Sequence, residues 1–106
     1  MSRHTFDVLA WARMTMFEQM GNIGSEVSRA LAAKRQGDEK SATAALYRGL
    51  DLIDATAEAW ALKRSARTRE LLRARELFVQ SVTTDIEDKT LETYFLQFAI
   101  VARRDK

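Results

Sequence analysis

The sequence predicts an all-α protein, and three observations lead to that prediction. The chain has no proline and only four glycines in 106 residues, so few positions favour sharp turns. Hydrophobic residues make up 46 % of the chain and charged residues 30 %, a balance that suits helices. Apolar residues also recur at helical spacing along most of the chain. We therefore expect residues 1–106 to form a single domain, an antiparallel up-and-down four-helix bundle.

The first helix is expected to run from about Thr5 to Gln36. Its apolar residues occupy less than half a turn of the helical wheel, as expected for an amphipathic helix packed on partners: Phe6, Leu9, Met16, Phe17, Met20, Ile23, Gly24, Val27, Ala30 and Leu31. Gly37 suits the left-handed position after the C-terminus of a helix. Gly24 faces inward, which favours close approach of another backbone, whereas Gly21 lies at the edge of the apolar arc and is interpreted as a bend.

The beginning of this helix has two interpretations. Because the helix is longer than the later ones, residues 1–11 would extend beyond a compact bundle. They form either a frayed end or an arm that packs, with Trp11, on a neighbouring subunit.

The second helix is expected to begin after Asp38, which is a good N-cap residue. Its inward residues are Ala42, Leu46, Tyr47, Gly49, Leu50, Ile53, Ala57 and Trp60. Neither glycine nor proline marks its end. We place the break between Glu58 and Ser65, because a continuous helix from Asp38 to Val82 cannot fold back on the first helix.

The third helix, about Ser65 to Val82, carries a charge in the middle of its apolar face. Its inward residues are Leu71, Leu72, Ala74, Phe78, Val79 and Val82, with Arg75 among them. An unpaired buried charge is costly, so Arg75 needs a carboxylate, for which Asp54 is the first choice and Glu26 the second. We expect Glu26, Asp54 and Arg75 to form a polar network that fixes the register of the helices. The alternative is the floor of a small polar cleft. Arg29 is expected to pair with Glu26 at i, i+3 spacing.

The fourth helix, about Glu87 to Arg103, is apolar over well over half of its circumference. Its apolar residues are Leu91, Tyr94, Phe95, Leu96, Phe98, Ala99, Ile100, Val101 and Ala102. Such a helix is usually covered twice, by its own bundle and by another subunit. The sequence therefore predicts a homo-oligomer whose interface includes Trp11, Leu52, Leu77, Leu96 and Ile100.

Charge is expected to divide between the two ends of the bundle, although the net charge is only +2. One end collects basic residues: Arg3, Arg13, Lys63, Arg64, Arg67, Arg69, Arg103, Arg104 and Lys106. The other collects acids: Asp38, Glu39, Asp85, Glu87 and Asp88. The basic end is either a solvated surface or a site for phosphates of RNA or DNA, with Lys63, Arg64, Arg67, Arg69, Arg103 and Arg104 as the contacts.

No catalytic, cofactor or metal site is expected. The chain has no cysteine, and its one histidine is His4. The acidic residues Asp51, Asp54 and Glu58 are interpreted as salt-bridge partners rather than cation ligands. Residues 1–14 are too interrupted by charges for a signal peptide or a membrane span, so a cytoplasmic protein without membrane contact is expected.

Three segments carry a resemblance to known proteins. They are residues 22–30 (NIGSEVSRA), 69–76 (RELLRARE) and 94–103 (YFLQFAIVAR). With them the chain, from about Trp11 to Arg103, resembles a family of short, uncharacterised prokaryotic helical proteins. In size, helicity and basic character it is also similar to the four-helix-bundle proteins that include ribosomal-RNA intervening-sequence proteins and accessory variability determinants of diversity-generating retroelements. These resemblances imply ring-shaped oligomers and nucleic-acid or reverse-transcriptase partners.

The function expected from the sequence is that of a non-enzymatic interaction or scaffold protein that acts as a homo-oligomer. The alternative is a nucleic-acid-binding accessory protein that uses the basic end.

Overall fold

The computed structural model describes residues 8–86 and 89–104. These residues form five helices and no strand: α1 (Val8–Arg13), α2 (Met16–Arg35), α3 (Glu39–Leu62), α4 (Thr68–Thr83) and α5 (Leu91–Arg104). The all-α class is therefore confirmed for the described part of the chain.

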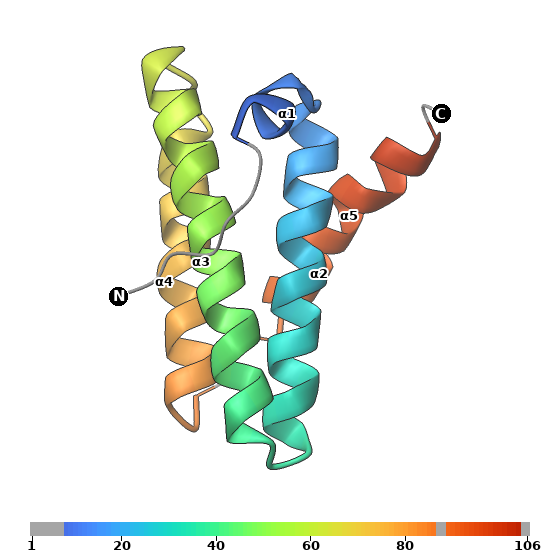
Figure 1. Ribbon diagram of the computed structural model, residues 1–106, viewed down its shortest axis with the longest axis vertical. Coiled ribbons are helices and arrows are strands. Elements are labelled where there is room, and N and C mark those ends of the chain that lie inside the picture. Colours follow the sequence, from blue (N-terminus) through green and yellow to red (C-terminus); the bar gives the residue numbers. More distant parts are fainter. Residues whose placement is uncertain (1–7, 87–88, 105–106) are drawn as a thin grey trace.

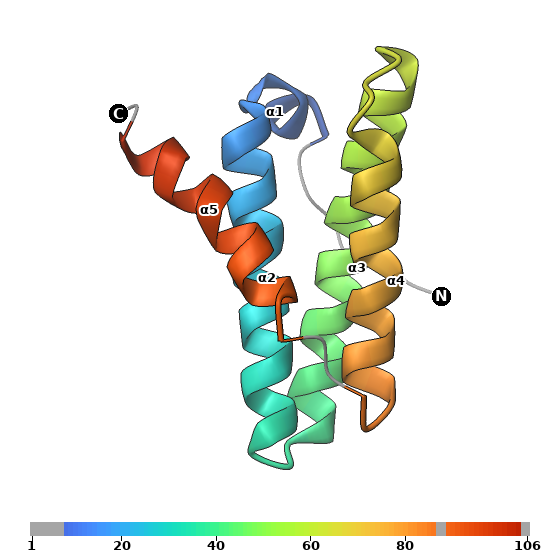
Figure 2. The same cartoon turned by 180° about the vertical axis from the view of Figure 1, so that it is seen from behind.

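Helix α2 is the centre of the arrangement. It packs on α3 on one side and on α5 on another, while α4 packs mainly on α3. Helices α2, α3 and α4 lie side by side and alternate in direction (Figure 1). Helix α5 crosses α2 obliquely, and its C-terminal half leans away from α3 and α4 in both views (Figure 2). The fourth long helix is thus attached to the body of the molecule chiefly through α2.

The apolar stripe of α2 is the core of the molecule. Met20, Ile23, Val27 and Leu31 are fully buried, together with residues from the other long helices: Ile53, Leu71, Phe78, Leu91 and Phe95. The amphipathic pattern of the sequence is confirmed here, because five of the seven buried α2 residues belong to the expected inward arc; Gln19 and Ala33 are the two that the pattern did not include.

Two glycines let α5 approach α2 closely. A Cβ atom added at Gly24 would lie 2.7 Å from the Cβ of Phe95, a distance that real Cβ atoms essentially never show. A Cβ added at Gly21 would lie 3.2 Å from the Cα of Ala99. The close packing expected at Gly24 is confirmed. The interpretation of Gly21 as a bend is corrected, since it packs on α5 as well.

A helix break at Thr15 contradicts the expected continuous first helix. The Oγ1 of Thr15 accepts a hydrogen bond from the Glu18 amide at 3.1 Å, and a Glu18 carboxylate oxygen accepts one from the Thr15 amide at 2.9 Å. This reciprocal pair is a capping box, which satisfies two backbone N–H groups at the start of α2. The chain therefore begins a new helix at Met16. The expected start at Thr5 lies outside the described residues.

Helix α1 packs on its own chain. Only 7 % of the surface of Trp11 is exposed, and its indole Nε1 donates a hydrogen bond to the Oγ1 of Thr56 at 2.9 Å. The side-chain Nε2 of Gln19 donates a hydrogen bond to the backbone carbonyl of Trp11, also at 2.9 Å. Trp11 is therefore a core residue of this subunit. Its assignment to an arm at a subunit interface is corrected, because α3 and α2 already cover it.

The turn between α2 and α3 has the expected chemistry. Gly37 has a φ of +76°, the left-handed conformation that glycine adopts at little cost. The Asp38 amide donates to the carbonyl of Ala33 and the Gly37 amide to that of Lys34, which is the Schellman arrangement. The Asp38 side chain then accepts a hydrogen bond from the Ser41 amide at 3.1 Å as the N-cap of α3. Both predictions for this turn are confirmed.

The end of α3 uses the same arrangement without glycine. Helix α3 ends at Leu62, within the expected range, and Arg64 has a φ of 54°. The Ser65 amide donates to the carbonyl of Trp60, and the Arg64 amide to that of Ala61. Arg64 therefore occupies the left-handed position that Gly37 occupies in the previous turn. The break was hard to locate in the sequence because the residue at this position is an arginine.

Replacing Arg64 by glycine is expected to raise the free energy of unfolding by about 1 kcal/mol, since glycine adopts positive φ without a clash of its Cβ. Urea denaturation followed by circular dichroism measures the change. Lys63→Gly is the matched control: Lys63 has a φ of −88°, so this exchange is expected to destabilise the protein or leave it unchanged. Equal effects of the two exchanges would contradict the assignment.

A lysine joins the C-terminus of α4 to α2. The Lys34 amine donates hydrogen bonds to the carbonyls of Ser81 and Thr84, at the end of α4. A cation is favourable at this end of a helix because it meets carbonyls that have no partner within the helix. Lys34 thus joins α2 to α4 at the end of the molecule opposite α1.

Candidate subunit interface and basic end

The ion pair expected at Arg75 is present. Its Nε lies 2.7 Å from one carboxylate oxygen of Asp54, and its Nη2 lies 3.3 Å from the other. The hydrogen bond to Asp54 raises the pKa of Arg75, while desolvation opposes it more weakly. The two side chains are 36 % and 44 % exposed, so the pair lies at the surface between α3 and α4 and joins those helices in register.

Glu26 does not belong to this pair. Its carboxylate accepts hydrogen bonds from the Nε of Arg48 at 3.2 Å and lies 3.3 Å from a guanidinium nitrogen of Arg29. The pairing of Arg29 with Glu26 is confirmed. The single network of Glu26, Asp54 and Arg75 is wrong, because Glu26 pairs with Arg48 and Arg29, whereas Asp54 pairs with Arg75.

Arg48 is a residue that the sequence interpretation missed. It reaches Glu26 because α2 and α3 approach closely beside it: a Cβ added at Gly49 would lie 3.3 Å from the Cβ of Glu26. The available signal was Gly49 itself, a glycine on the inward arc of its helix.

The most exposed apolar residues of α5 are Leu96 and Ile100. Their surfaces are 52 % and 45 % exposed, whereas Leu91, Phe95 and Phe98 of the same helix are buried. Leu96 and Ile100 are four residues apart, so they form one ridge on the helix surface. Of the five residues expected at a subunit interface, Leu96 and Ile100 have the exposed apolar side chains that an interface requires. Leu52 and Leu77 are partly buried against the core of their own chain and so offer less exposed surface; their assignment to an interface stays a prediction.

A groove runs beside this ridge, between α2 and α5. Its floor is made by small side chains of α2 and α5, and charged residues stand at its edges; the lining includes Gly21, Gly24, Ser25, Ser28, Arg29, Glu92, Leu96, Ala99 and Arg103. We call the ridge of Leu96 and Ile100 together with this groove the association face. It combines a protruding and a recessed strip on one side of the molecule.

A polar cluster fixes α5 to α4. The hydroxyl of Tyr94 donates a hydrogen bond to Glu70 at 2.5 Å, and Arg67 lies 3.4 Å from the same oxygen. The guanidinium of Arg67 also lies 5.9 Å from the ring centroid of Phe98, within cation-π range. Burial, followed by the hydrogen bond to Glu70, raises the pKa of Tyr94 far above its ordinary value of 10.0.

This tyrosine is expected to make the protein less stable in strong alkali. Above pH 10 the unfolded state loses the phenol proton while the folded state keeps it, so stability falls as the pH rises. The slope is expected to be less than about 1.4 kcal/mol per pH unit, because the side chain is only partly buried. Urea denaturation at several pH values from neutral to alkaline measures this slope. Tyr94→Phe should remove this contribution, and an identical slope in both proteins would contradict the prediction.

The basic end divides into two groups. Lys63, Arg64 and Arg69 lie around the α3–α4 turn, are exposed, and have no ion-pair partner among residues 8–86 and 89–104. We call these three residues the turn cluster. Arg67 differs from them because it is paired with Glu70.

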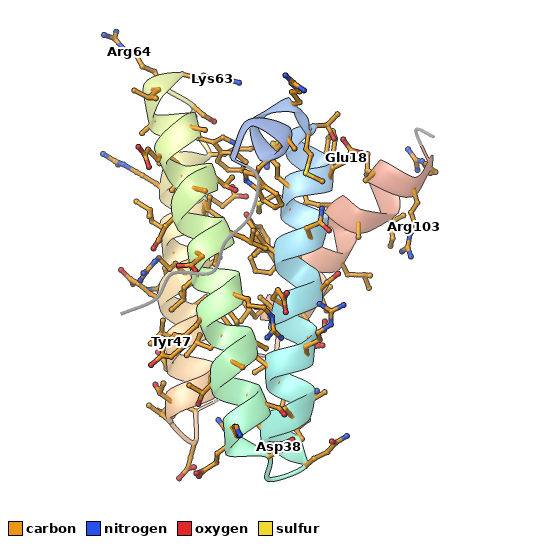
Figure 3. The ribbon with its side chains drawn as sticks, in the orientation of Figure 1. Glu18, Asp38, Tyr47, Lys63, Arg64 and Arg103 are labelled. Atoms are coloured by element: carbon orange, nitrogen blue, oxygen red, sulfur yellow. The ribbon has the colours of Figure 1, made fainter. Side chains whose placement is uncertain are left out.

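Arg103 and Arg104 form the second group, on α5. Figure 3 shows Lys63 and Arg64 projecting from the end of α3, whereas Arg103 lies across the molecule on the diverging α5. The single basic surface expected from the sequence is therefore not formed within one chain, because α5 leans away from the bundle. Asp38 lies at the opposite end, as expected (Figure 3). Arg3 and Lys106 lie outside the described residues.

Within the part of the chain that the structure describes, no group of three acidic, histidine or cysteine side chains is placed to hold a metal ion. Nor is any helix there long and apolar enough to span a membrane.

Comparisons of the chain with protein-family models, with curated protein sequences and with solved structures found no match. The resemblances drawn from the three sequence segments remain predictions.

Proposed function

We propose that this chain is a non-enzymatic interaction protein that acts as a homo-oligomer through the association face. The observation that carries the proposal is the pair Leu96 and Ile100, which stay exposed on a helix whose opposite side is buried in the core. Burying the exposed half of each side chain would contribute about 1 kcal/mol. Two subunits would bury four such side chains, so the ridge favours self-association.

The oligomeric state tests this proposal. Light scattering during size-exclusion chromatography, over a series of concentrations, is expected to show a mass that is a multiple of 12.1 kDa. Leu96→Glu with Ile100→Glu should give a monomer whose circular dichroism is unchanged. The matched control is Leu62→Glu with Leu72→Glu, because these leucines are also exposed but lie on α3 and α4. A native chain that is monomeric at every concentration overturns the proposal.

A second candidate function is nucleic-acid binding by the turn cluster. The specific observation is that Lys63 and Arg64 in the α3–α4 turn and Arg69 in the first turn of α4 are exposed, with no acidic partner in the described part of the chain. Three cations on a helix-helix turn suit the phosphate backbone, which binds Lys and Arg with little dependence on base sequence. A homo-oligomer would present several copies of the cluster.

Salt dependence tests this second function. With three phosphate contacts, affinity for a labelled DNA duplex is expected to fall about 40-fold between about 50 and about 200 mM salt. Fluorescence anisotropy measures it, with single-stranded RNA as a second probe. Lys63→Glu with Arg69→Glu should abolish binding, whereas Lys40→Glu with Lys89→Glu, a charge change of the same size at exposed positions outside the turn cluster and the association face, should weaken it less. Affinity that is insensitive to salt or to the first pair of exchanges contradicts this function.

A further inference from the structure

We infer that the association face binds a second copy of itself, with the two α5 helices antiparallel about a two-fold axis. This inference rests on the proposed homo-oligomer and specifies its partner surface and geometry. The axis would pass between Leu96 and Ile100.

The charges along α5 favour the antiparallel direction. Glu92 lies one turn before Leu96, and Arg103 lies three residues after Ile100, so the ridge has an acid at one end and a base at the other. Antiparallel pairing would place Glu92 opposite Arg103 of the partner at both ends of the contact. Parallel pairing would place like charges opposite each other, which disfavours it.

Both charges are positioned for such a contact. Glu92 is held beside the groove by Arg35 of α2, at 2.8 Å, and its side chain remains 34 % exposed. A carboxylate can accept hydrogen bonds from more than one guanidinium. Arg103 lines the other end of the groove, is exposed, and has no ion-pair partner among the described residues.

The shape of the face is also self-complementary. The ridge of Leu96 and Ile100 stands directly beside a groove floored by Gly21, Ser25 and Ser28. In a two-fold dimer the same surface serves both subunits, so each ridge would enter the groove of the partner. The small side chains of the groove allow the two helices to approach closely, as ridges-into-grooves packing requires.

The diverging end of α5 makes room for this contact. Its C-terminal half stands clear of α3 and α4 in both views (Figures 1 and 2), so a partner helix meets only α2 and α5. A contact limited to two helices is small, and we expect dissociation in the micromolar range.

Cross-linking tests the geometry directly, because the chain has no cysteine of its own. Thr93 and Arg104 are exposed neighbours of the two charged positions and belong neither to the ridge nor to the Glu92–Arg103 pair. Thr93→Cys and Arg104→Cys would lie opposite each other in the antiparallel dimer. In the same dimer, position 93 of one subunit would lie about 16 Å along the helix from position 93 of its partner, and the same holds for position 104, because a helix rises 1.5 Å per residue.

The two cysteine variants are mixed and treated with a short bis-maleimide, and the products are weighed by mass spectrometry. A cross-link between Thr93→Cys and Arg104→Cys is expected to dominate, with little product from either variant alone. Adding Leu96→Glu and Ile100→Glu to both variants should remove it. Predominant linkage of Thr93→Cys to itself overturns the antiparallel geometry.

The outcomes also separate this inference from the proposed function. A dimer by light scattering that gives no such cross-link would leave the homo-oligomer standing and overturn α5 pairing. A monomer at all concentrations would overturn both. As an independent readout, Arg103→Glu is expected to raise the dissociation constant about tenfold at low salt. Arg104→Glu, the same charge change one residue away, should raise it less. Equal effects would count against the Glu92–Arg103 contact.

Discussion

Replacing Phe95 by alanine is expected to lower the free energy of unfolding by about 3–5 kcal/mol. Phe95 is fully buried where α5 crosses α2, and its ring packs against the ring of Tyr94 with centroids 5.1 Å apart. Gly24 opposite has no side chain that could fill the space, so a cavity would remain. Since α5 is held chiefly by α2, loss of this contact is expected to loosen the whole helix.

Urea denaturation followed by circular dichroism measures this loss. Gln97→Ala is the control, because Gln97 is exposed on the same helix and lies outside the ridge, so its exchange should change stability by less than about 0.5 kcal/mol. If the two variants unfold at the same urea concentration, α5 does not pack on α2 through Phe95.

Trp11→Ala is expected to lower the free energy of unfolding by about 3 kcal/mol. This value is at the lower end of the range for a buried aromatic residue, because α1 is short and lies at the periphery of the molecule. The exchange removes a large side chain from the α1–α3 contact and leaves the hydroxyl of Thr56 without its indole donor. Thr56 still donates to the carbonyl of Leu52 at 2.8 Å, so the hydroxyl keeps one partner.

This variant also distinguishes the two placements of α1. If Trp11 packs within its own subunit, Trp11→Ala lowers the urea midpoint and leaves the oligomer mass unchanged. An unchanged midpoint with a smaller mass would instead support an arm that packs on a neighbour. Arg13→Ala, an exposed exchange in the same helix, is the control for each measurement.

The parts of the fold that follow from single-helix patterns could be predicted. The stripe of α2 is buried because Met20, Ile23, Val27 and Leu31 repeat at helical spacing, and burial of such a stripe is the main gain on folding. The pair of Arg75 and Asp54 was also predictable. The sequence pattern placed Arg75 and Asp54 on the inward faces of neighbouring helices, where a charge needs an opposite charge. The pair forms as expected, although both side chains are partly exposed between α3 and α4.

Other features depend on local or three-dimensional information that the apolar pattern does not contain. The capping box of Thr15 and Glu18 was visible in the sequence, but the apolar arc continues across it and favoured one long helix. The oblique path of α5 depends on the contact of Gly24 with Phe95, which requires both helices in place. For the same reason the basic residues of α5 and of the α3–α4 turn could not be separated from sequence alone.

The burial of Trp11 has a consequence for spectroscopy. The chain has only two tryptophans, and both lie at the same α3 face: Trp11 is bound to Thr56, and Trp60 follows Thr56 by one turn. Each is 7 % exposed, and α5 contains neither. Tryptophan fluorescence would therefore shift to longer wavelength when α1 detaches, because Trp11 would become exposed to water. It would stay constant when subunits associate through α5. A urea titration repeated at several protein concentrations, read by tryptophan emission and by light scattering, would follow these two events as independent signals.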